Sequence, residues 1–407
     1  MKVNAKRIEN DINQINKFNS TPGQGISRLT FTEEYMGAMN YIFQELERIG
    51  AQVKIMRGGN IRARLEGSEK DAPSVMIGSH IDSVFRGGMF DGVVGTVTSL
   101  EVLRAISENN IPHKNSIDFV IFAEEDGSRF SSVLLGSRIW AGKVTKEDLP
   151  KILDKEGISY FEAMTKSGLV PQDESILDRK KIKAMIESHI EQSRVLESKS
   201  IPIGIVETIA GIKQLEVTIE GVSNHAGATP MNLRNDALCG AAEIILNAEK
   251  FASQNDTSVA TVGLVKVSPG KNNIIPGKVE LTLDIRDRND VILNEITDRI
   301  INSIETTCNN RGLIYSIKQA SYTRPVLLSK RVVEVLENSA IKQGINTLKM
   351  VSGAVHDSSV VAELADVGMI FVPSKNGRSH CPEEHTDLKD IEIAANILLE
   401  SVLELSK

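Results

Sequence analysis

The order of apolar patterns between residues 211 and 325 constrains the fold of this chain more than any other feature of its sequence. The spacing of apolar residues predicts, in order, a strand over 215–220, a helix over 236–251, strands over 258–267 and 279–285, a helix over 291–308 and a strand over 313–318. This β-α-β-β-α-β order is that of a split βαβ unit, in which helices cover one sheet. We therefore expect this segment to fold as a domain of its own.

The sequence on both sides of this segment has a different pattern. At 407 residues the chain is longer than one hydrophobic core usually serves, so two domains are expected. Helical periodicity, such as that over 32–49, alternates with short apolar strands before and after the segment. We predict an α/β protein with a discontinuous catalytic domain, residues 1–210 and 326–407, whose mixed central sheet is flanked by helices. A ferredoxin-like (βαββαβ) domain at 211–325 is inserted into it.

The composition excludes several classes of protein. Hydrophobic residues make up 41% of the chain and charged residues 25%, which argues against a disordered, fibrous or membrane protein. The formal net charge of −7 gives no basic surface for nucleic acid, and no apolar run approaches the roughly 18 residues of a membrane span. An N-terminus without an apolar signal segment predicts a cytoplasmic protein. Three cysteines without CxxC spacing predict reduced thiols and no thiolate metal site.

A histidine and two acids mark the end of an expected strand. The strand near Val75 runs into Gly-Ser-His-Ile-Asp-Ser, which contains His80 and Asp82, and Asp91 follows nine residues later. Ligands bind at the carboxyl ends of the strands of an α/β sheet, and an imidazole beside a carboxylate suits a divalent metal. Asp82 is placed to hydrogen-bond the His80 ring and hold its ligating tautomer. The alternative is a structural histidine beside solvated acids.

Three adjacent acids, Glu124, Glu125 and Asp126, directly follow the next apolar strand. Adjacent carboxylates near a core repel one another unless a cation neutralises them. Metal-assisted hydrolysis also needs a base beside the ion, so these acids can divide into ligand and base. Spacing alone does not decide which acid takes which role, and an acidic surface loop is the alternative.

Two further histidines complete a possible dinuclear site. His189 follows the apolar pair Met185-Ile186, and His380 lies in Gly-Arg-Ser-His-Cys-Pro. A lone histidine is more often structural than a ligand. Together with the first two segments, however, these histidines supply nitrogen and oxygen ligands for two ions, which lie roughly 3.5–4 Å apart in dinuclear hydrolases.

Six motifs in the same order resemble those of one enzyme family. They are Gly-Ser-His-Ile-Asp-Ser, Gly-Gly-Met-Phe-Asp-Gly, Ala-Glu-Glu-Asp-Gly-Ser-Arg-Phe, His-Ile-Glu-Gln, Ser-Asn-His-Ala-Gly-Ala-Thr-Pro-Met and Ser-His-Cys-Pro. Through them nearly the whole chain resembles N-carbamoyl-L-amino-acid hydrolases, β-ureidopropionases and allantoate amidohydrolases, which are relatives of the dinuclear zinc exopeptidases.

The resemblance implies a cofactor of two divalent metal ions per subunit. Zinc is the first choice, and manganese, cobalt and nickel are alternatives because imidazole and carboxylate ligands suit all of them. The ligands that the resemblance implies are His80 and His189 for one ion, Glu125 and His380 for the other, and Asp91 as the bridge. Glu124 is then the general base that activates a water molecule and passes its proton to the leaving nitrogen.

The expected insertion carries a second polar cluster. Arg286 suits bidentate capture of a substrate carboxylate, and His225 suits donation to a developing oxyanion, with Asn273 nearby in the pattern. A loop histidine, a turn asparagine and a strand-end arginine are the alternatives. The resemblance implies that this domain is a lid and a homodimer interface, and that His225 acts in the neighbouring subunit. The other substrate-pocket residues that it implies are Gln192, Gly353 and His356.

These features favour a hydrolase of a small ureido acid. N-carbamoyl-L-amino acids, which would give amino acid, carbon dioxide and ammonia, are the first choice, and allantoate is the alternative. The segment Gly-Ile-Lys-Gln from residue 211 departs from the Gly-Gln-Arg pattern associated with allantoate enzymes, which favours the first choice. His189 stands where exopeptidase relatives usually carry an acid, which argues against a dipeptidase or aminopeptidase. A non-catalytic binding protein is the remaining alternative, and the retained ligands and base argue against it.

Overall fold

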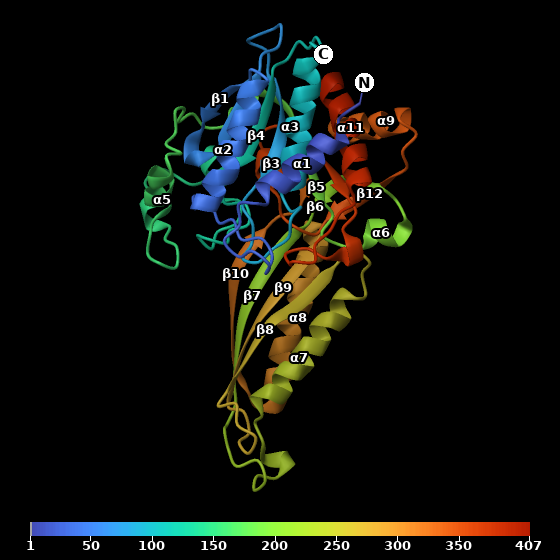
Figure 1. Ribbon diagram of the computed structural model, residues 1–407. Coiled ribbons are helices and arrows are strands. Elements are labelled where there is room, and N and C mark those ends of the chain that lie inside the picture. Colours follow the sequence, from blue (N-terminus) through green and yellow to red (C-terminus); the bar gives the residue numbers. More distant parts are fainter. Residues whose placement is uncertain (1) are drawn as a thin grey trace. The chain divides into compact units, whose positions relative to one another are not determined.

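The computed structural model describes residues 2–407, which form two compact units (Figure 1). The first unit comprises residues 2–207 and 328–407, and the second comprises residues 208–327. Each unit has its own cluster of buried apolar side chains. Because both ends of the chain contribute to the first unit, the second unit interrupts it in sequence.

The main sheet has nine strands and is mixed, and nearly all of it belongs to the first unit. Its strands in spatial order are β1 (Gln52–Ile55), β2 (Ile61–Leu65), β4 (Ile117–Phe122), β3 (Ser74–His80), β5 (Ile182–Ile190), β13 (Asp366–Val372), β6 (Ile203–Ile209) and β11 (Val326–Leu327), with β12 (Thr347–Ser352) paired to β6. The four central strands β4, β3, β5 and β13 are parallel, and β2 and β6 flank them in antiparallel orientation. The predicted mixed sheet is confirmed.

The first unit also contains helices, several of which pack on this sheet. They are α1 (Ala5–Ile15), α2 (Glu33–Arg48), α3 (Val93–Glu108), α4 (Leu135–Trp140), α5 (Tyr160–Ser167), α6 (Val195–Lys199), α9 (Lys330–Lys342), α10 (Asp357–Val361) and α11 (Leu388–Leu405). Helix α3 is buried along most of its length because it contacts β3, β4 and β5 as well as α1 and α11. Within residues 2–407, no helix combines the length and apolar character that crossing a bilayer requires.

Capping explains where α2 begins and ends. The hydroxyl of Thr32 accepts a hydrogen bond from the main-chain N–H of Tyr35, as an N-cap residue does. Gly50 lies just past the end of the helix with φ of 74°, in the left-handed conformation that glycine adopts without strain. The helix predicted over 32–49 is therefore confirmed.

The second unit is a four-stranded antiparallel sheet with two long helices. In chain order its elements are β7 (Gly211–Glu220), α7 (Ala237–Ala252), β8 (Val259–Ser268), β9 (Lys278–Asp287), α8 (Asp290–Arg311) and β10 (Ile314–Thr323). The strands lie in the order β10-β7-β9-β8, and α7 and α8 pack side by side along them (Figure 1). Alternate residues of β7 and β9 are buried in the core of this unit, which is the period expected of strands with one covered face.

Candidate metal centre

The parallel strands bring residues that are far apart in sequence to one edge of the main sheet. His80 is the last residue of β3 and pairs with Phe122, the last residue of β4, after which the three acids follow. His189 near the end of β5 pairs with Phe371 near the end of β13. The carboxyl ends of parallel strands meet at the same edge, which is where α/β proteins place their ligands.

Asp91 lies at the centre of the resulting cluster. Its Oδ1 is 3.6 Å from Nε2 of His80 and 3.2 Å from Nε2 of His189, whereas its Oδ2 is 3.0 Å from Nε2 of His380. Burial opposes ionisation of Asp91, but interactions with the three neighbouring histidine side chains hold its pKa well below the usual value. One carboxylate with two imidazoles beside one oxygen and one beside the other could hold a divalent cation among these side chains.

The rings of His80 and His189 are oriented by main-chain carbonyls. Nδ1 of His80 lies 3.1 Å from the carbonyl oxygen of Asp82, and Nδ1 of His189 lies 3.0 Å from that of Ile190. A carbonyl only accepts, so each Nδ1 carries a proton and each Nε2 is left to face Asp91. Both Nε2 atoms are buried without a hydrogen-bond partner. A divalent cation fits these nitrogen atoms, because ligating histidines are held through their other ring nitrogen in this way.

Two neighbouring residues also hold His80 in place. The Asp82 carboxylate accepts hydrogen bonds from the main-chain N–H groups of Glu125 at 3.3 Å and Asp126 at 3.1 Å, which ties the two segments together. The predicted bond from this carboxylate to the His80 ring is not formed. Its oxygen is 3.7 Å from Nδ1, and the nearer main-chain carbonyl takes its place. Gly92 packs on the ring, because a Cβ there would lie 2.5 Å from ring atoms.

Glu124 has one fixed and one available carboxylate oxygen. Oε1 accepts hydrogen bonds from the main-chain N–H groups of Arg129 at 2.9 Å and Phe130 at 2.6 Å, whereas Oε2 is buried without a partner. The backbone of Glu124 is left-handed, with φ of 54°, which is uncommon outside glycine. Burial, followed by the charge of Asp82, raises the pKa of Glu124 to about 7. A carboxylate with these properties suits a general base at neutral pH.

The other two acids of the run lie beside different histidines. Oε2 of Glu125 is 3.6 Å from Nε2 of His80, and Oδ1 of Asp126 is 3.6 Å from Nε2 of His380. The residue sets that place three possible ligand atoms within 4.8 Å of one another are His80-Asp91-His189, Glu187-His189-His356, His80-Asp82-Asp126 and Asp91-Asp126-His380. Asp126, which received no role from its sequence, is therefore a second candidate beside Glu125 for the ion next to His380. Its only sequence signal is its place in the run of acids.

Two of the predicted pocket residues contact the ligand candidates. Nε2 of Gln192 donates to Oδ2 of Asp91 at 2.9 Å and lies 3.2 Å from Nε2 of His380. The ring of His356 meets that of His189 edge to face, with centroids 4.5 Å apart. Gly353 lies in the bend that follows β12. A cation beside His380 would therefore also lie next to the side chain of Gln192.

The predicted residues of the loops in the second unit are held by main-chain contacts. His225 is exposed, and its Nδ1 accepts hydrogen bonds from the N–H groups of Gly227 and Ala228, both at 3.1 Å. Nδ1 is thus an acceptor, so the ring proton sits on Nε2 and is available for donation. The N–H of Ala226 donates to the carbonyl of Asn273 at 2.9 Å, which joins the two loops.

Arg286 of β9 has a carboxylate partner within its own strand. Its Nε and Nη2 lie 2.7 and 3.1 Å from the two oxygens of Asp284, which is two residues away on the same face of the sheet. Nε2 of Gln214 on β7 donates to the same carboxylate at 3.0 Å. The two-pronged contact that the sequence predicts with a substrate is therefore made here with Asp284.

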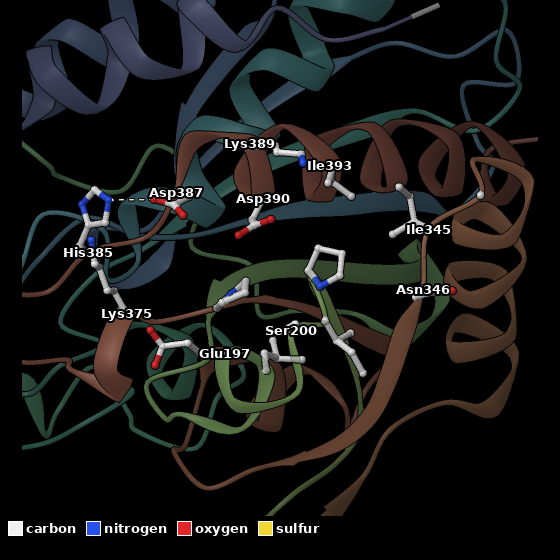
Figure 2. Close-up of a pocket in the computed structure, with 15 residues that line it drawn as sticks. Glu197, Ser200, Ile345, Asn346, Lys375, His385, Asp387, Lys389, Asp390 and Ile393 are labelled. Carbon is white, nitrogen blue, oxygen red and sulfur yellow. Dashed lines mark hydrogen bonds and ion pairs between the residues drawn. The ribbon is translucent and has the colours of Figure 1, made fainter.

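A separate surface cleft lies beside the segment between β13 and α11, which carries His380. It has a volume of about 560 Å³, and Pro373, Lys375, His385 and Asp387 are among its lining residues. Figure 2 shows His385 bonded to Asp387 at one end of the cleft. The residues His80, Asp91, Glu124, His189 and His380 are not among those that line it. The cleft is therefore distinct from the candidate metal centre.

Metal binding by the metal-free protein should depend on pH. The hydrogen bond to Asp91 raises the pKa of His380 to about 9, so this ring is protonated at neutral pH. The proton must leave before Nε2 can bind a cation, so the apparent affinity for Zn²⁺ should rise up to about tenfold per pH unit between about pH 7 and 9. Calorimetry in buffers of different ionisation enthalpy measures the released protons, and binding without proton release at pH 7 would contradict this account.

The amino-acid sequence of this chain is similar to those of known hydrolases. The chain matches the sequence model of Peptidase family M20/M25/M40 over residues 76–404. It is 38% identical to an N-carbamoyl-L-amino-acid amidohydrolase of Paenarthrobacter aurescens, over 100% of this chain and 99% of the relative. It is 32% identical to the allantoate amidohydrolase of Escherichia coli (strain K12), over 94% of each chain.

A solved structure extends the likeness to the fold. The crystal structure of an amidase of the hydantoinase/carbamoylase family from Burkholderia multivorans superposes with a TM-score of 0.96 at 32% identity, over 100% of this chain and 98% of that one. The family and the clustered ligand atoms together indicate a divalent metal site. The chain therefore belongs to Peptidase family M20/M25/M40, in the group that contains N-carbamoyl-L-amino-acid amidohydrolases and allantoate amidohydrolases.

Proposed function

We propose that this protein is a metal-dependent amidohydrolase that cleaves the ureido C–N bond of a small N-carbamoyl-L-amino acid, giving the amino acid, carbon dioxide and ammonia. The observation that carries the proposal is that the two carboxylate oxygens of Asp91 face three imidazoles. Glu124, which lies just after β4, has one carboxylate oxygen without a hydrogen-bond partner. The full-length likeness to a carbamoyl amino acid hydrolase supports this substrate class.

The proposed cofactor is a pair of divalent ions, with zinc as the first choice. The ligands assigned to them are His80 and His189 for one ion, His380 with Glu125 for the other, and Asp91 between them. When bound, such ions polarise a carbonyl oxygen and lower the pKa of a water molecule toward neutrality. Glu124 takes a proton from the attacking water through Oε2 and returns it to the leaving nitrogen, while Oε1 stays bonded to the main chain. Because Oε1 is held by these hydrogen bonds, Oε2 is the atom that carries the transferred proton.

Residues of the second unit complete the proposed reaction. The Nε2–H of His225 is a donor for the negative charge that develops on the carbamoyl oxygen. Arg286 binds the substrate carboxylate, which requires it to share or exchange its contact with Asp284. Closure of this unit as a lid brings both groups, with Asn273, to the substrate and excludes water. Gln192, Gly353 and His356 line the rest of the proposed pocket.

The second unit is also the proposed homodimer interface, through which His225 reaches the partner's active site. Support comes from β8, an edge strand with exposed Val259, Leu264 and Val265, since unpaired edge strands with apolar side chains favour pairing with another chain. Sedimentation should give a dimer of the 44.5 kDa chain, and Leu264→Lys should shift it toward monomer and lower activity at the same time. Ile341→Lys, at an exposed apolar residue of the first unit, is the matched control. A monomeric, fully active wild-type protein would contradict the interface.

Allantoate hydrolysis is the second candidate, which the 32% identical Escherichia coli relative supports. The segment that disfavours it lies beside Arg286, because Ile212 of β7 pairs with Arg286 and Gln214 binds its partner Asp284. The residues that depart from the Gly-Gln-Arg pattern thus lie beside the proposed carboxylate site. This position supports the carbamoyl amino acid as the first choice.

A direct assay tests the proposed function. Metal-loaded protein should release ammonia from N-carbamoyl-L-methionine faster than from N-carbamoyl-β-alanine or allantoate. The amide of N-carbamoyl-L-methionine, which lacks the carboxylate for Arg286, should be a poor substrate. Faster release from allantoate would select the second candidate. No release from any of the three, with divalent metal shown to be bound, would reject ureido acids as substrates. A cytoplasmic location remains a prediction that cell fractionation tests.

A further inference from the structure

We infer that Glu384 is a positioning residue that sets the distance between the Asp91 and His380 segments of the metal centre. The inference rests on the proposed ligand roles of those two residues. Glu384 is only 4% exposed and lies four residues after His380, in the segment that leads from β13 to α11. Nothing in its sequence context, a run of two glutamates before a histidine, distinguishes it from a surface acid.

The carboxylate of Glu384 bonds to both ligand-bearing segments at once. Oε1 accepts hydrogen bonds from the main-chain N–H groups of Phe90 at 2.9 Å and Asp91 at 3.0 Å. Oε2 accepts from the hydroxyl of Ser379 at 2.8 Å and from the main-chain N–H of His380 at 3.3 Å. One oxygen serves each segment, and bonds of this kind to a buried charge are stronger than neutral ones. Glu384 therefore acts as a clamp between the two segments.

Close packing accompanies these hydrogen bonds. A Cβ on Gly88 would lie 2.1 Å from Oε1 of Glu384 and 2.4 Å from its Cβ, so the clamp requires glycine at this position. The rings of Phe90 and His385, which are neighbours of Asp91 and Glu384, meet edge to face with centroids 5.5 Å apart. The contact between the two segments is therefore both polar and steric.

No regular structure otherwise fixes the spacing of these ligands. Residues 81–91 precede α3 and residues 378–387 precede α11, and neither range forms a helix or one of the named strands. His80 and His189, by contrast, are held by the hydrogen bonds of β3 and β5. The 3.0 Å between Asp91 and His380 thus depends on side-chain contacts, of which the Glu384 clamp has the most bonds to the main chain. We expect Glu384 to control affinity for the ion beside His380.

Glu384→Gln tests the clamp with little change in size. The amide keeps one acceptor oxygen, but its NH₂ group cannot accept a bond from the N–H of His380, so only half of the clamp can form. Affinity for Zn²⁺, measured by competition with a chromophoric chelator, should fall about 10–100-fold. The visible absorption of bound Co²⁺ should change as well. Activity should recover when metal is raised to saturation, because the substituted residue does not touch the substrate.

Gly88→Ala approaches the same contact from the other side. Its Cβ displaces Glu384 without altering the carboxylate, so it should weaken Zn²⁺ binding in the same way. Because both changes break one contact, the double variant should bind no more weakly than the weaker single variant. If Glu384→Gln does not fold, the Gly88→Ala measurement decides the question alone.

A control separates positioning from general damage. Asp287 is buried and accepts hydrogen bonds from the hydroxyls of Thr257 and Ser258 and the N–H of Asn289, all in the second unit. Asp287→Asn should leave Zn²⁺ affinity unchanged. The inference is overturned if Glu384→Gln binds Zn²⁺ as the wild type does, or if Asp287→Asn weakens binding equally. Wild-type protein that binds no Zn²⁺ at all would instead reject the proposed function.

Discussion

Replacing Glu124 with glutamine should lower kcat roughly 10²–10⁴-fold while metal content stays unchanged, because this is the usual contribution of a general base. The glutamine can still accept the main-chain bonds of Arg129 and Phe130 through its oxygen. Its NH₂ group would replace Oε2, and an amide NH₂ group cannot take a proton from water. Steady-state kinetics together with metal analysis of the purified variant measure both parts of this expectation.

The dependence of activity on pH is a second measurement on the same variant. If Glu124 is the base, the fall in wild-type activity toward acid pH should disappear in the residual activity of Glu124→Gln. Glu101→Gln is the matched control, because Glu101 is also a fully buried glutamate but pairs with Arg7 on α1 instead of facing the metal cluster. Glu124→Gln with near-normal kcat would reject the assignment, and loss of metal from this variant would make Glu124 a ligand.

Removal of divalent metal should abolish activity and lower the thermal stability of the protein. Several acids near the cluster are buried together. Burial and neighbouring acids raise the pKa of Asp126 to about 7 and hold the pKa values of Glu125 and Asp357 well above their usual range. These shifts mean that burial, followed by mutual repulsion, disfavours the ionised carboxylates in the metal-free protein. A bound cation removes the repulsion. A free metal concentration of 100 times the Kd adds about 2.7 kcal/mol to the free energy of unfolding.

Thermal unfolding before and after chelation measures this effect. Readdition of Zn²⁺ or Mn²⁺ should restore both activity and the unfolding temperature. His80→Ala serves as the control, because a variant that lacks a ligand should respond less to chelation than the wild type. Activity that survives complete chelation would contradict the metal-dependent mechanism, whatever the identity of the ion.

Local sequence patterns predicted most elements but missed several strands of the main sheet. In β5, Glu187 is fully buried and accepts a hydrogen bond from the hydroxyl of Ser79 at 2.7 Å. Only the apolar pair Met185-Ile186 before it has a pattern that is recognisable locally, because the partner that satisfies Glu187 comes from another strand. β6 and β12 were not predicted either. They pair with each other, so their stability depends on contacts between segments far apart in the chain.

The sequence by itself determined the order of most helices and strands and the types of residue at the candidate metal centre. Amphipathic periods and caps act within a few residues, so they can be read without the fold. Only the tertiary structure decided that Asp91 divides its two oxygens among three histidines, that Asp126 approaches His380, and that a buried Glu384 joins two loops. Those distances depend on the register of parallel strands and on loops packed against them. No local pattern encodes such contacts, because their partners are up to hundreds of residues apart.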